Sequence, residues 1–546
     1  MSDTRRTVAG RSIRWDEARA EQARAAGLWG TDTLGYTLRH AARETPDRVV
    51  LIDGDVHLTC SDLHRRASAL AVALLDRMPT GSVVSFMLPN WSEAAVVYLG
   101  ATLAGMVVNP ILPSLRDHEL RFILGDADSR MIFVPDTFRG HDYSAMLTRV
   151  AETIEAPPEV VVVRGDAGPH VSYEDLFDAR ATDLEIRVDP DAVRMIMYTS
   201  GTTARPKGVL HTHNSIHALI SQIREHWLVD PGDRFLVPSP IAHVGGSIYA
   251  FECPLLLGST AVLMQQWDPD GAIALMREHR CTHMAGATPF LEQLLAAAER
   301  ADTRLPDLKV FICGGASVPP SLIRRATAYF DGARVSRVYG STEVPVTTVG
   351  ALADPDAAAD TDGRPGIADV WLVARDPGGM GGQTGEIRVR GAQMLAGYLH
   401  PEDEADAFDA DGYFRTGDIG RWADDALVVT GREKDLIIRN GENISPKEVE
   451  DILIGHLGIA EVAVVGVPDA RTGERACAVI VPVGSARPCV DDLGDFLLGQ
   501  GVARFKVPER VAVWESLPKN DAGKVLKHRI RMALDEAHTG GEIDVQ

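Results

Sequence analysis

A loop rich in hydroxyls and glycines is the segment whose residue types point most clearly to chemistry. It reads YTSGTTARPKG from Tyr198 to Gly208 and follows the apolar run VRMIMY, so we expect it to begin where a strand ends. Small residues let backbone N–H groups approach phosphate oxygens, and Lys207 adds a positive charge. Its spacing differs from a Walker A loop, because Pro206 precedes the lysine. The pattern predicts phosphate binding, with a solvated polar loop as the alternative.

Further segments hold residues suited to nucleotide chemistry. In chain order they are Gly314-Gly315-Ala316, Tyr339-Gly340-Ser341-Thr342-Glu343, Thr416-Gly417-Asp418, Arg432 in GREKD and Lys524 in LPKNDAGKVLK. A glutamate suits Mg²⁺, which prefers oxygen ligands, and an aspartate can accept two hydrogen bonds from a ribose diol. A lysine can lie between a carboxylate and a phosphate that otherwise repel each other. Taken singly, each of these residues also fits an ordinary turn or surface position.

Together these motifs resemble those of the adenylate-forming superfamily, which includes acyl-CoA synthetases, peptide-synthetase adenylation domains and luciferases. The resemblance covers roughly residues 35 to 530 and is strongest toward medium-chain and alicyclic acyl-CoA ligases, such as cyclohexanecarboxylate–CoA ligase. It implies that an acid–thiol ligase forms an acyl-adenylate with ATP and Mg²⁺ and passes the acyl group to coenzyme A. One departure is Ala204, which stands where the family's loops usually have glycine.

The resemblance also implies a role for each motif residue. Lys524 is expected to be the catalytic lysine, and Lys207, His243 and Glu343 are expected to act with it. The residues expected to bind ATP and AMP are Thr199, Ser200, Gly201, Thr202, Thr203, Lys207, Gly314, Gly315, Ala316, Tyr339, Gly340, Ser341, Thr342, Asp418, Arg432 and Lys524. Glu343 and Thr202 are expected to lie at the Mg²⁺ ion.

Two features of the resemblance concern the second half-reaction. Lys434 stands where the family has the hinge of its C-terminal domain. Gly441, Glu442 and Asn443 stand where the family flanks the pantetheine channel, although a plain turn before a helix explains them equally well.

The acceptor is open at this point, because coenzyme A and an acyl carrier protein present the same thiol. Basic side chains could hold the nucleotide phosphates of coenzyme A, and the candidates are Lys447, Arg471 and Arg475. A catalytically silent nucleotide-binding module is the alternative from another class. The intact set of charged motif residues disfavours it.

The segment 239–258 resembles the part of the family that builds the acid pocket. The residues expected to line that pocket are His243, Gly246, Ser247, Gly286, Ala287 and Val344. No Asp or Glu lies between Phe235 and Phe251, whereas a buried substrate ammonium would need a charged partner. The small, apolar surroundings favour a neutral medium-chain, branched or alicyclic acid over an amino acid.

Composition excludes several other classes of protein. The net charge is −22, from 55 basic and 77 acidic residues, so we expect neither nucleic acid nor an anionic membrane as a partner. The six cysteines form no CxxC pair, which argues against a zinc site or a disulfide framework. No apolar run is long enough for a membrane span, and the start lacks a signal-peptide core. We therefore expect a cytoplasmic enzyme.

The expected fold class is α/β, in more than one domain, because 546 residues exceed a single core. Short apolar runs alternate with helical patterns, which predicts βα subdomains with largely parallel sheets. Residues 350–430 have the turn-rich texture of a β-rich subdomain. We place a large N-terminal domain at residues 1–433 and a small, mobile α+β C-terminal domain at 434–546, with a loose tail from His538.

Overall fold

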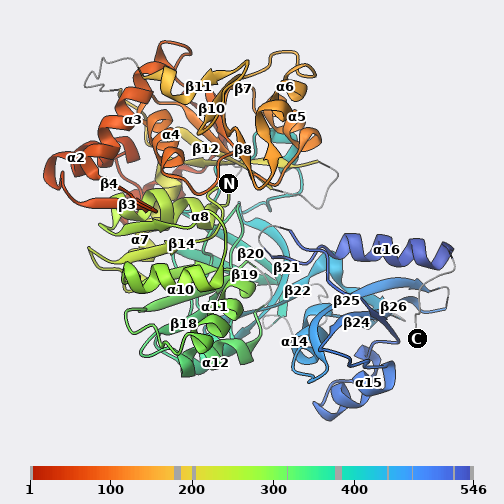
Figure 1. Cartoon of the computed structure of the whole chain (residues 1–546). Helices are drawn as coiled ribbons and strands as arrows, with labels where there is room; N and C mark the ends of the chain where they lie inside the picture. The colour runs from red at the N-terminus through yellow and green to blue at the C-terminus, as the bar shows by residue number, and fades with distance from the viewer. Residues whose placement is uncertain are drawn as a thin grey trace.

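The computed structural model describes residues 4–177, 186–199, 205–315, 318–374, 384–439, 442–469, 471–520 and 523–540. Figure 1 shows a large body, coloured red to cyan, and a smaller blue domain attached at its side. This confirms the expected α/β fold with a large N-terminal and a smaller C-terminal domain. Among the described residues, none of the helices has both the length and the apolar character needed to cross a membrane.

The first sheet of the large domain is parallel except at its end. Within the described residues its strand order is β11-β10-β7-β5-β6-β12-β13. The bounds are Val171–Ser172, Glu159–Val163, Ser129–Pro135, Val83–Phe86, Val107–Pro110, Val193–Thr199 and Lys207–Thr212, in that order. The pair β12–β13 is antiparallel, which allows the short loop between them to reverse the chain.

The second sheet has the same character. Its order, again for the described residues, is β18-β17-β16-β14-β15-β3-β4. The bounds are Arg334–Val338, Val310–Gly314, His283–Gly286, Arg234–Val237, Thr260–Leu263, Val49–Asp53 and Val56–Thr59, in that order. All neighbours pair in parallel except β3 and β4. Both sheets therefore confirm the predicted βα arrangement.

Helices connect the parallel strands and cover the sheets. They are α2 (Leu34–Glu44), α3 (Cys60–Leu75), α4 (Ser92–Leu103), α5 (Asp117–Asp126), α6 (Tyr143–Ala151), α7 (His213–His226), α8 (Val244–Ser247), α9 (Cys253–Leu256), α10 (Pro269–Glu278), α11 (Thr288–Arg300), α12 (Pro320–Tyr329) and α13 (Pro355–Asp360). The sequence WSEAAVVYLGATLAG predicts an amphipathic helix at α4, but the helix is buried on nearly every face. It packs against α2 and α3 as well as the sheet, so it has no solvent side.

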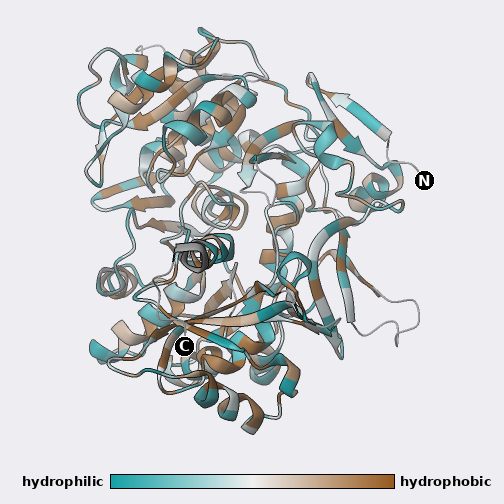
Figure 2. Ribbon diagram, turned by 90° about the vertical axis from the view of Figure 1, so that its right-hand side faces the viewer, coloured by the Kyte–Doolittle hydropathy of each residue, from teal (hydrophilic) through white to brown (hydrophobic). Residues whose placement is uncertain are grey.

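The largest hydrophobic cluster joins the two sheets. It includes side chains from α3 and α4, from β5 and β6, and from β14 and β17. Figure 2 shows brown, hydrophobic colouring on many of the inner strands and helices. The ends of both sheets are thereby fixed relative to each other, which matters because the candidate motifs lie at those ends.

A smaller antiparallel sheet and an N-terminal hairpin complete the large domain. The sheet has the order β19-β20-β21-β22, with bounds Ala368–Val373, Thr384–Gly391, Phe414–Ala423 and Ala426–Arg432. It confirms the β-rich texture predicted for this region. The hairpin, β1 (Thr4–Val8) and β2 (Arg11–Trp15), is followed by α1 (Glu17–Ala25). Short strands β8 (Thr137–Phe138) and β9 (His141–Asp142) form a further hairpin.

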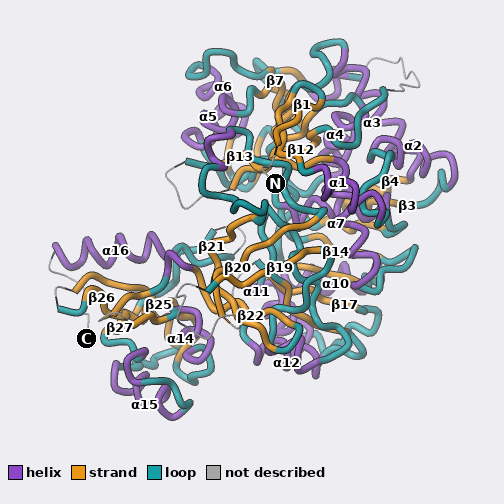
Figure 3. Tube along the Cα trace, turned by 180° about the vertical axis from the view of Figure 1, so that it is seen from behind, coloured by secondary structure: helices purple, strands orange, loops and turns teal. Residues whose placement is uncertain are grey.

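The C-terminal domain is α+β, as expected. Its sheet has the order β24-β23-β26-β25, and β27 also pairs with β26; the bounds are Glu442–Ile444, Ile437–Arg439, Gly473–Pro482, Ile459–Asp469 and Arg510–Val513. Its helices are α14 (Pro446–Leu453), α15 (Val490–Gly499) and α16 (Lys527–Gly540). Figure 3 shows this domain beside β21 and β22 from behind. Because α16 extends to Gly540, the first three residues of the predicted tail, counted from His538, belong to this helix.

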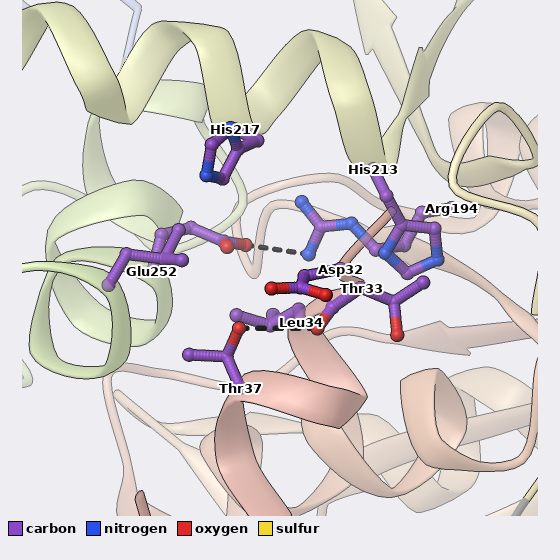
Figure 4. A pocket seen from close by; sticks show the side chains of 9 residues that line it. Asp32, Thr33, Leu34, Thr37, Arg194, His213, His217 and Glu252 are labelled. Atoms are coloured by element: carbon purple, nitrogen blue, oxygen red, sulfur yellow. Dashed lines mark hydrogen bonds and ion pairs between the residues drawn. The ribbon is translucent and has the colours of Figure 1, made fainter. Parts of the chain in front are cut away.

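A buried ion pair ties the first sheet to its covering helices. Arg194 occupies a bulge in β12, and its Nη1 lies 2.7 Å from Glu252 Oε1. The hydroxyl of Tyr98, from α4, also donates to Glu252 at 2.6 Å. Both charged side chains are 1% exposed, and Figure 4 shows them facing each other beside His213. Glu252 ends the π-helical turn Ile248–Glu252, so this pair fixes the segment that follows α8.

Replacing Glu252 with glutamine should lower the free energy of unfolding by about 3 kcal/mol, because the Arg194 charge would stay buried without a counter-ion. Urea denaturation followed by tryptophan fluorescence measures this loss. The control is Arg130→Gln, which removes a pair with Asp128 whose side chains are 54% and 68% exposed, and should cost less than about 0.5 kcal/mol. Equal effects of the two substitutions would contradict the argument.

Candidate active site

The predicted phosphate loop connects two neighbouring strands. Thr199 is the last residue of β12 and lies opposite Lys207, the first residue of β13. The loop therefore begins at the end of a strand, as predicted. Ser200, Gly201, Thr202 and Thr203 lie outside the described residues, as does Ala204.

The Lys207 ammonium lies beside a segment that comes 196 positions later in the sequence, at Asp403. Its Nζ donates to the backbone carbonyl of Asp403 at 3.3 Å, and it lies 3.8 Å from a carboxylate oxygen of the same residue. It also lies 5.2 Å from the ring centroid of Tyr398. Arg205 pairs with Asp403 as well, at 2.9 Å. Two cations thus gather at the mouth of the predicted loop around one acid.

Three residues from separate motifs form a connected group. The hydroxyl of Tyr339 donates to Asp418 Oδ2 at 2.7 Å, and Arg432 Nε donates to Asp418 Oδ1 at 2.8 Å. Asp418 and Arg432 lie directly opposite each other on β21 and β22, which explains their meeting despite the turn between them. Burial and the neighbouring Asp418 raise the pKa of the Tyr339 hydroxyl. This side chain is therefore a fixed hydrogen-bond donor at neutral pH.

Glu343 is held by a tyrosine that the motifs do not include. The hydroxyl of Tyr398 donates to Glu343 Oε1 at 3.0 Å, and the second carboxylate oxygen has no hydrogen bond to the residues that the structure describes. Burial and Glu343 raise the pKa of Tyr398, so it remains protonated. The neighbouring Thr342 carbonyl accepts from His211 Nε2 at 2.7 Å. His211 therefore holds the loop at the Thr342 carbonyl, and Tyr398 holds it at the Glu343 side chain.

The two glycines at the end of β17 serve different purposes. A Cβ on Gly314 would lie 2.8 Å from the Val338 carbonyl oxygen, so this glycine lets β17 and β18 approach each other. Gly315 has a φ of +82°, and nothing lies within 4 Å of the position of its Cβ. Its exposed backbone is therefore open to a flat ligand. Ala316 lies outside the described residues.

Lys524, in the C-terminal domain, lies close enough to Asp418 and Arg432 for their charges to act on its ammonium. Its turn is closed by its own backbone N–H, which donates to Asn520 Oδ1 at 2.8 Å. A Cβ on the preceding Gly523 would lie 2.9 Å from Pro289 Cγ in α11, so the turn packs closely against the large domain. Burial lowers the pKa of the Lys524 ammonium, and Arg432 lowers it further, while Asp418 acts in the opposite direction.

The predicted acid-pocket residues lie at the ends of the second sheet. His243 precedes α8, which carries Gly246 and Ser247, while Gly286 ends β16 and Ala287 caps α11. The Nε2 atom of His243 is buried without a hydrogen-bond partner among the described residues, and burial lowers its pKa. A neutral imidazole with one unused nitrogen at this position can interact with a carboxyl group.

Val344 differs in its surroundings from the other predicted pocket residues. It is 1% exposed and belongs to the cluster under the β-rich sheet, with Val209, Val389 and Tyr398. Val346, two residues later, packs instead against the cluster that contains Ile241 and Ala285. The side chains of Val344 and Val346 therefore pack in different cores.

The residue predicted to be the hinge follows the β-rich sheet, and the residues predicted to flank the channel come just after it in the C-terminal domain. Lys434 is within the short 3-10 turn Glu433–Asp435, which links β22 to β23. Glu442 is exposed at the start of β24, while Gly441 lies outside the described residues. Asn443 pairs with Ile438 through the β24–β23 ladder.

Tyr398, Asp403 and His211 are the functional candidates that motif analysis missed. All three contact motif residues, yet they stand 55, 196 and 131 positions away from their partners. No local spacing could pair residues so distant in sequence. The available signal was the two-residue alternation of β13, which places His211 on the same face as Val209 and Lys207.

Replacing His211 with glutamine should change how stability depends on pH. Burial lowers the pKa of His211 from 6.5 to about 4, so the unfolded chain binds the proton first as pH falls. The part of the free energy of unfolding that depends on neutral His211 is fully present above pH 6.5. It is lost progressively between pH 6.5 and about 4, with a slope of at most about 1.4 kcal/mol per pH unit. Urea unfolding of both proteins from about pH 7 to about pH 4.5 should show a shrinking difference. A difference independent of pH would contradict this.

Comparison with known proteins identifies the family. The model of the AMP-binding enzymes matches residues 38–399, and that of the AMP-binding enzyme C-terminal domain matches residues 448–524. A medium-chain fatty-acid–CoA ligase from Escherichia coli is 33% identical over 538 residues, which are 95% of this chain and 94% of that protein. A ligase from Rhodococcus jostii, named for a methyl-dioxo-octahydroindenyl-propanoyl group and CoA, is 34% identical and covers 91% of this chain and 98% of its own.

A solved structure shows the same fold. ATP-bound MatB from Rhodopseudomonas palustris superposes with a TM-score of 0.80 at 26% identity, covering 93% of this chain and all of that one, at 100%. Both family models and the full-length relatives agree with the motifs at Lys207, Tyr339 and Lys524 in placing ATP chemistry in this protein. The chain therefore belongs to the AMP-binding enzymes, the adenylate-forming superfamily of AMP-forming acid–thiol ligases.

Proposed function

We propose that this protein uses ATP to convert a neutral carboxylic acid of modest size into an acyl-adenylate and then into a coenzyme A thioester. The observation that carries the proposal is the position of Lys524, which the C-terminal domain brings to the Asp418–Arg432 pair of the large domain. Two adjacent cations repel each other, so an anion between them would be favoured. The adenylate's phosphate and the acid's carboxylate are such anions.

The roles of the remaining residues follow from this assignment. Tyr339 and the open backbone of Gly315 suit the adenine, and Asp418 with Arg432 suits the ribose hydroxyls. Lys207 and the residues Thr199 to Thr203 are assigned to the phosphates. Lys524 neutralises the carboxylate and the α-phosphate as they meet, which lowers the repulsion between two anions. The nucleophile is the substrate itself, so no serine or cysteine is needed.

Magnesium fits the residues that are present. The free carboxylate oxygen of Glu343 is a hard ligand of the kind Mg²⁺ prefers, and Thr202 is its proposed companion. Within the described residues no group of three or more His, Cys, Asp or Glu side chains could hold a metal ion. That agrees with Mg²⁺, which keeps water ligands and binds through substrate phosphates rather than in an all-protein cage. The ion would supply charge neutralisation at the leaving pyrophosphate.

The acid pocket favours a substrate without an ammonium group. Glu252, which lies within the predicted pocket segment 239–258, is already engaged by Arg194 and Tyr98. It therefore cannot serve as a counter-ion for an amino acid. The neutral His243 and the apolar side chains of Val244 and Val346 leave a small, uncharged lining. A medium-chain, branched or alicyclic acid matches it, and the names of the two curated relatives agree with such acids.

Coenzyme A is the proposed acceptor, and the thioester step uses a second orientation of the C-terminal domain. Rotation about Lys434 would withdraw Lys524 and bring the segment Gly441, Glu442 and Asn443 to the adenylate. We place the domain boundary there, at 433 and 434, because β22 and β23 belong to different sheets. The cytoplasm is the proposed compartment, since it holds ATP and coenzyme A.

An acyl carrier protein is the second candidate acceptor. Two of the basic side chains considered for the phosphates of coenzyme A have acidic partners: Arg475 lies 2.6 Å from Asp469, and Lys447 lies 2.5 Å from Asp451. These ion pairs would have to open before either side chain could bind a phosphate. The carrier alternative therefore deserves a direct product measurement.

Replacing Lys524 with alanine should reduce adenylate formation at least about a hundredfold, because its charge acts while two anions meet. Transfer from a supplied acyl-adenylate to coenzyme A should stay within about threefold of the unmodified protein, because the thiol attacks an anhydride already formed. Pyrophosphate exchange into ATP measures the first step, and thioester formation measures the second. Lys527→Ala, whose native side chain pairs with Glu450, is the control and should affect neither. Equal losses in both steps would refute this role.

A panel of carboxylic acids tests the substrate and the acceptor together. Pyrophosphate release is measured with each acid, with coenzyme A, with an acyl carrier protein and without either. Neutral medium-chain and alicyclic acids should be turned over at least about tenfold better than amino acids of similar size, because a buried ammonium lacks a partner. Product masses separate coenzyme A thioesters from loaded carrier. Activity with amino acids alone would overturn the proposed substrate class.

A further inference from the structure

The N-terminal hairpin contacts a segment that also makes hydrogen bonds to two of the proposed catalytic side chains, Lys207 and Glu343. Arg5 Nη1 and Arg14 Nη1 lie 2.8 and 3.2 Å from Glu404 Oε2, and the Glu404 side chain is only 7% exposed. The Arg14 backbone N–H donates to the Ala396 carbonyl at 2.8 Å. The Arg14 guanidinium also lies 3.6 Å from the ring centroid of Phe408. We call residues 396–404 the brace segment.

The second oxygen of Glu404 points back into the brace segment. Glu404 Oε1 accepts the backbone N–H of Tyr398 at 3.0 Å. Gly397 allows this approach, because a Cβ there would lie 2.5 Å from the same oxygen, and its φ is +123°. One buried carboxylate therefore joins two arginines of the hairpin to the backbone of Tyr398.

The brace segment in turn lies against the strand that begins at Lys207. The Ala396 N–H donates to the Leu210 carbonyl at 2.8 Å, and the Leu210 N–H donates to the Gly397 carbonyl at 3.0 Å. The Leu399 N–H donates to the Gly208 carbonyl at 2.8 Å. From this position Tyr398 donates to Glu343, and the Asp403 carbonyl accepts from Lys207. A shift of the brace segment would therefore move the partners of both proposed ATP-site residues.

We propose that Glu404, held by Arg5 and Arg14, is a positioning residue for Lys207 and Glu343, so that the N-terminal hairpin helps to set the affinity of the active site for ATP. The inference rests on the proposed function, in which those two side chains act at the phosphates and at Mg²⁺. Both the hairpin and Glu404 lie outside residues 38–399, which match the family model, so this device is additional to the matched region.

Glu404→Ala is the principal test, compared with Asp191→Ala as a matched control. Asp191 is also a buried acid held by two arginines of the N-terminal segment, Arg24 at 2.8 Å and Arg6 at 3.6 Å, but it has no described contact with the brace segment. Both variants lose a buried counter-ion, so both should lower thermal stability. Only Glu404→Ala should raise the KM for ATP, by about fivefold or more, with the KM for the acid within about twofold.

A measurement on the ligand-free protein separates positioning from activity. Amide hydrogen exchange in peptides from the brace segment should speed up at least about tenfold in Glu404→Ala and stay unchanged in Asp191→Ala. Glu404→Gln keeps the size and one acceptor for Tyr398, so it should fold if alanine does not, with a rise in ATP KM of about two- to threefold.

Three outcomes would overturn the inference: equal rises in ATP KM for both alanine variants, an unchanged ATP KM in Glu404→Ala, or unchanged exchange in the brace segment. Failure of the proposed function looks different. In that case the unmodified protein would show no pyrophosphate exchange into ATP with any acid. Amide hydrogen exchange in the brace segment would still be faster in Glu404→Ala than in the unmodified protein.

Discussion

The candidate active site depends on one buried carboxylate that interacts electrostatically with cations from two domains. Asp418 is 8% exposed at its side chain; it receives hydrogen bonds from Tyr339 and Arg432 and stabilises the charge of Lys524. Without Asp418 the two cations would repel each other and the buried tyrosine hydroxyl would lose its acceptor. The orientation of the C-terminal domain is thereby coupled to the Asp418–Arg432 pair. In the proposed function, this conformation is the one for the first half-reaction.

Two kinds of contact hold the residues around Asp418 in place. Backbone packing fixes the glycine-containing turns, as at Gly314 and Gly523, where a side chain would collide with a neighbouring element. Long-range polar contacts fix the charged residues, as at Tyr398 and His211. Both kinds keep the proposed catalytic groups in place before substrates arrive, which is how such a site would lower a barrier between two anions without a protein nucleophile.

The motifs were readable from sequence because each is local. A loop such as 198–208 has its chemistry within a few residues of strand, and the βα alternation predicts that such loops meet at one edge of a sheet. The same reasoning predicted an amphipathic helix at α4, but the helix is buried on nearly every side. This reasoning also placed Val344 in the acid pocket. Val344 and Val346 stand two residues apart yet pack in different cores, which their positions in the sequence do not reveal.

The sequence by itself determined the family, the order of the motifs and the α/β class, since each rests on residues close together in the chain. Only the tertiary structure decided which cations share Asp418, that Tyr398 holds Glu343, and that the first residues brace the segment up to Glu404. The reason is physical: these contacts join residues tens to hundreds of positions apart, and their geometry is set by how the two sheets and the C-terminal domain pack. No local pattern carries that information.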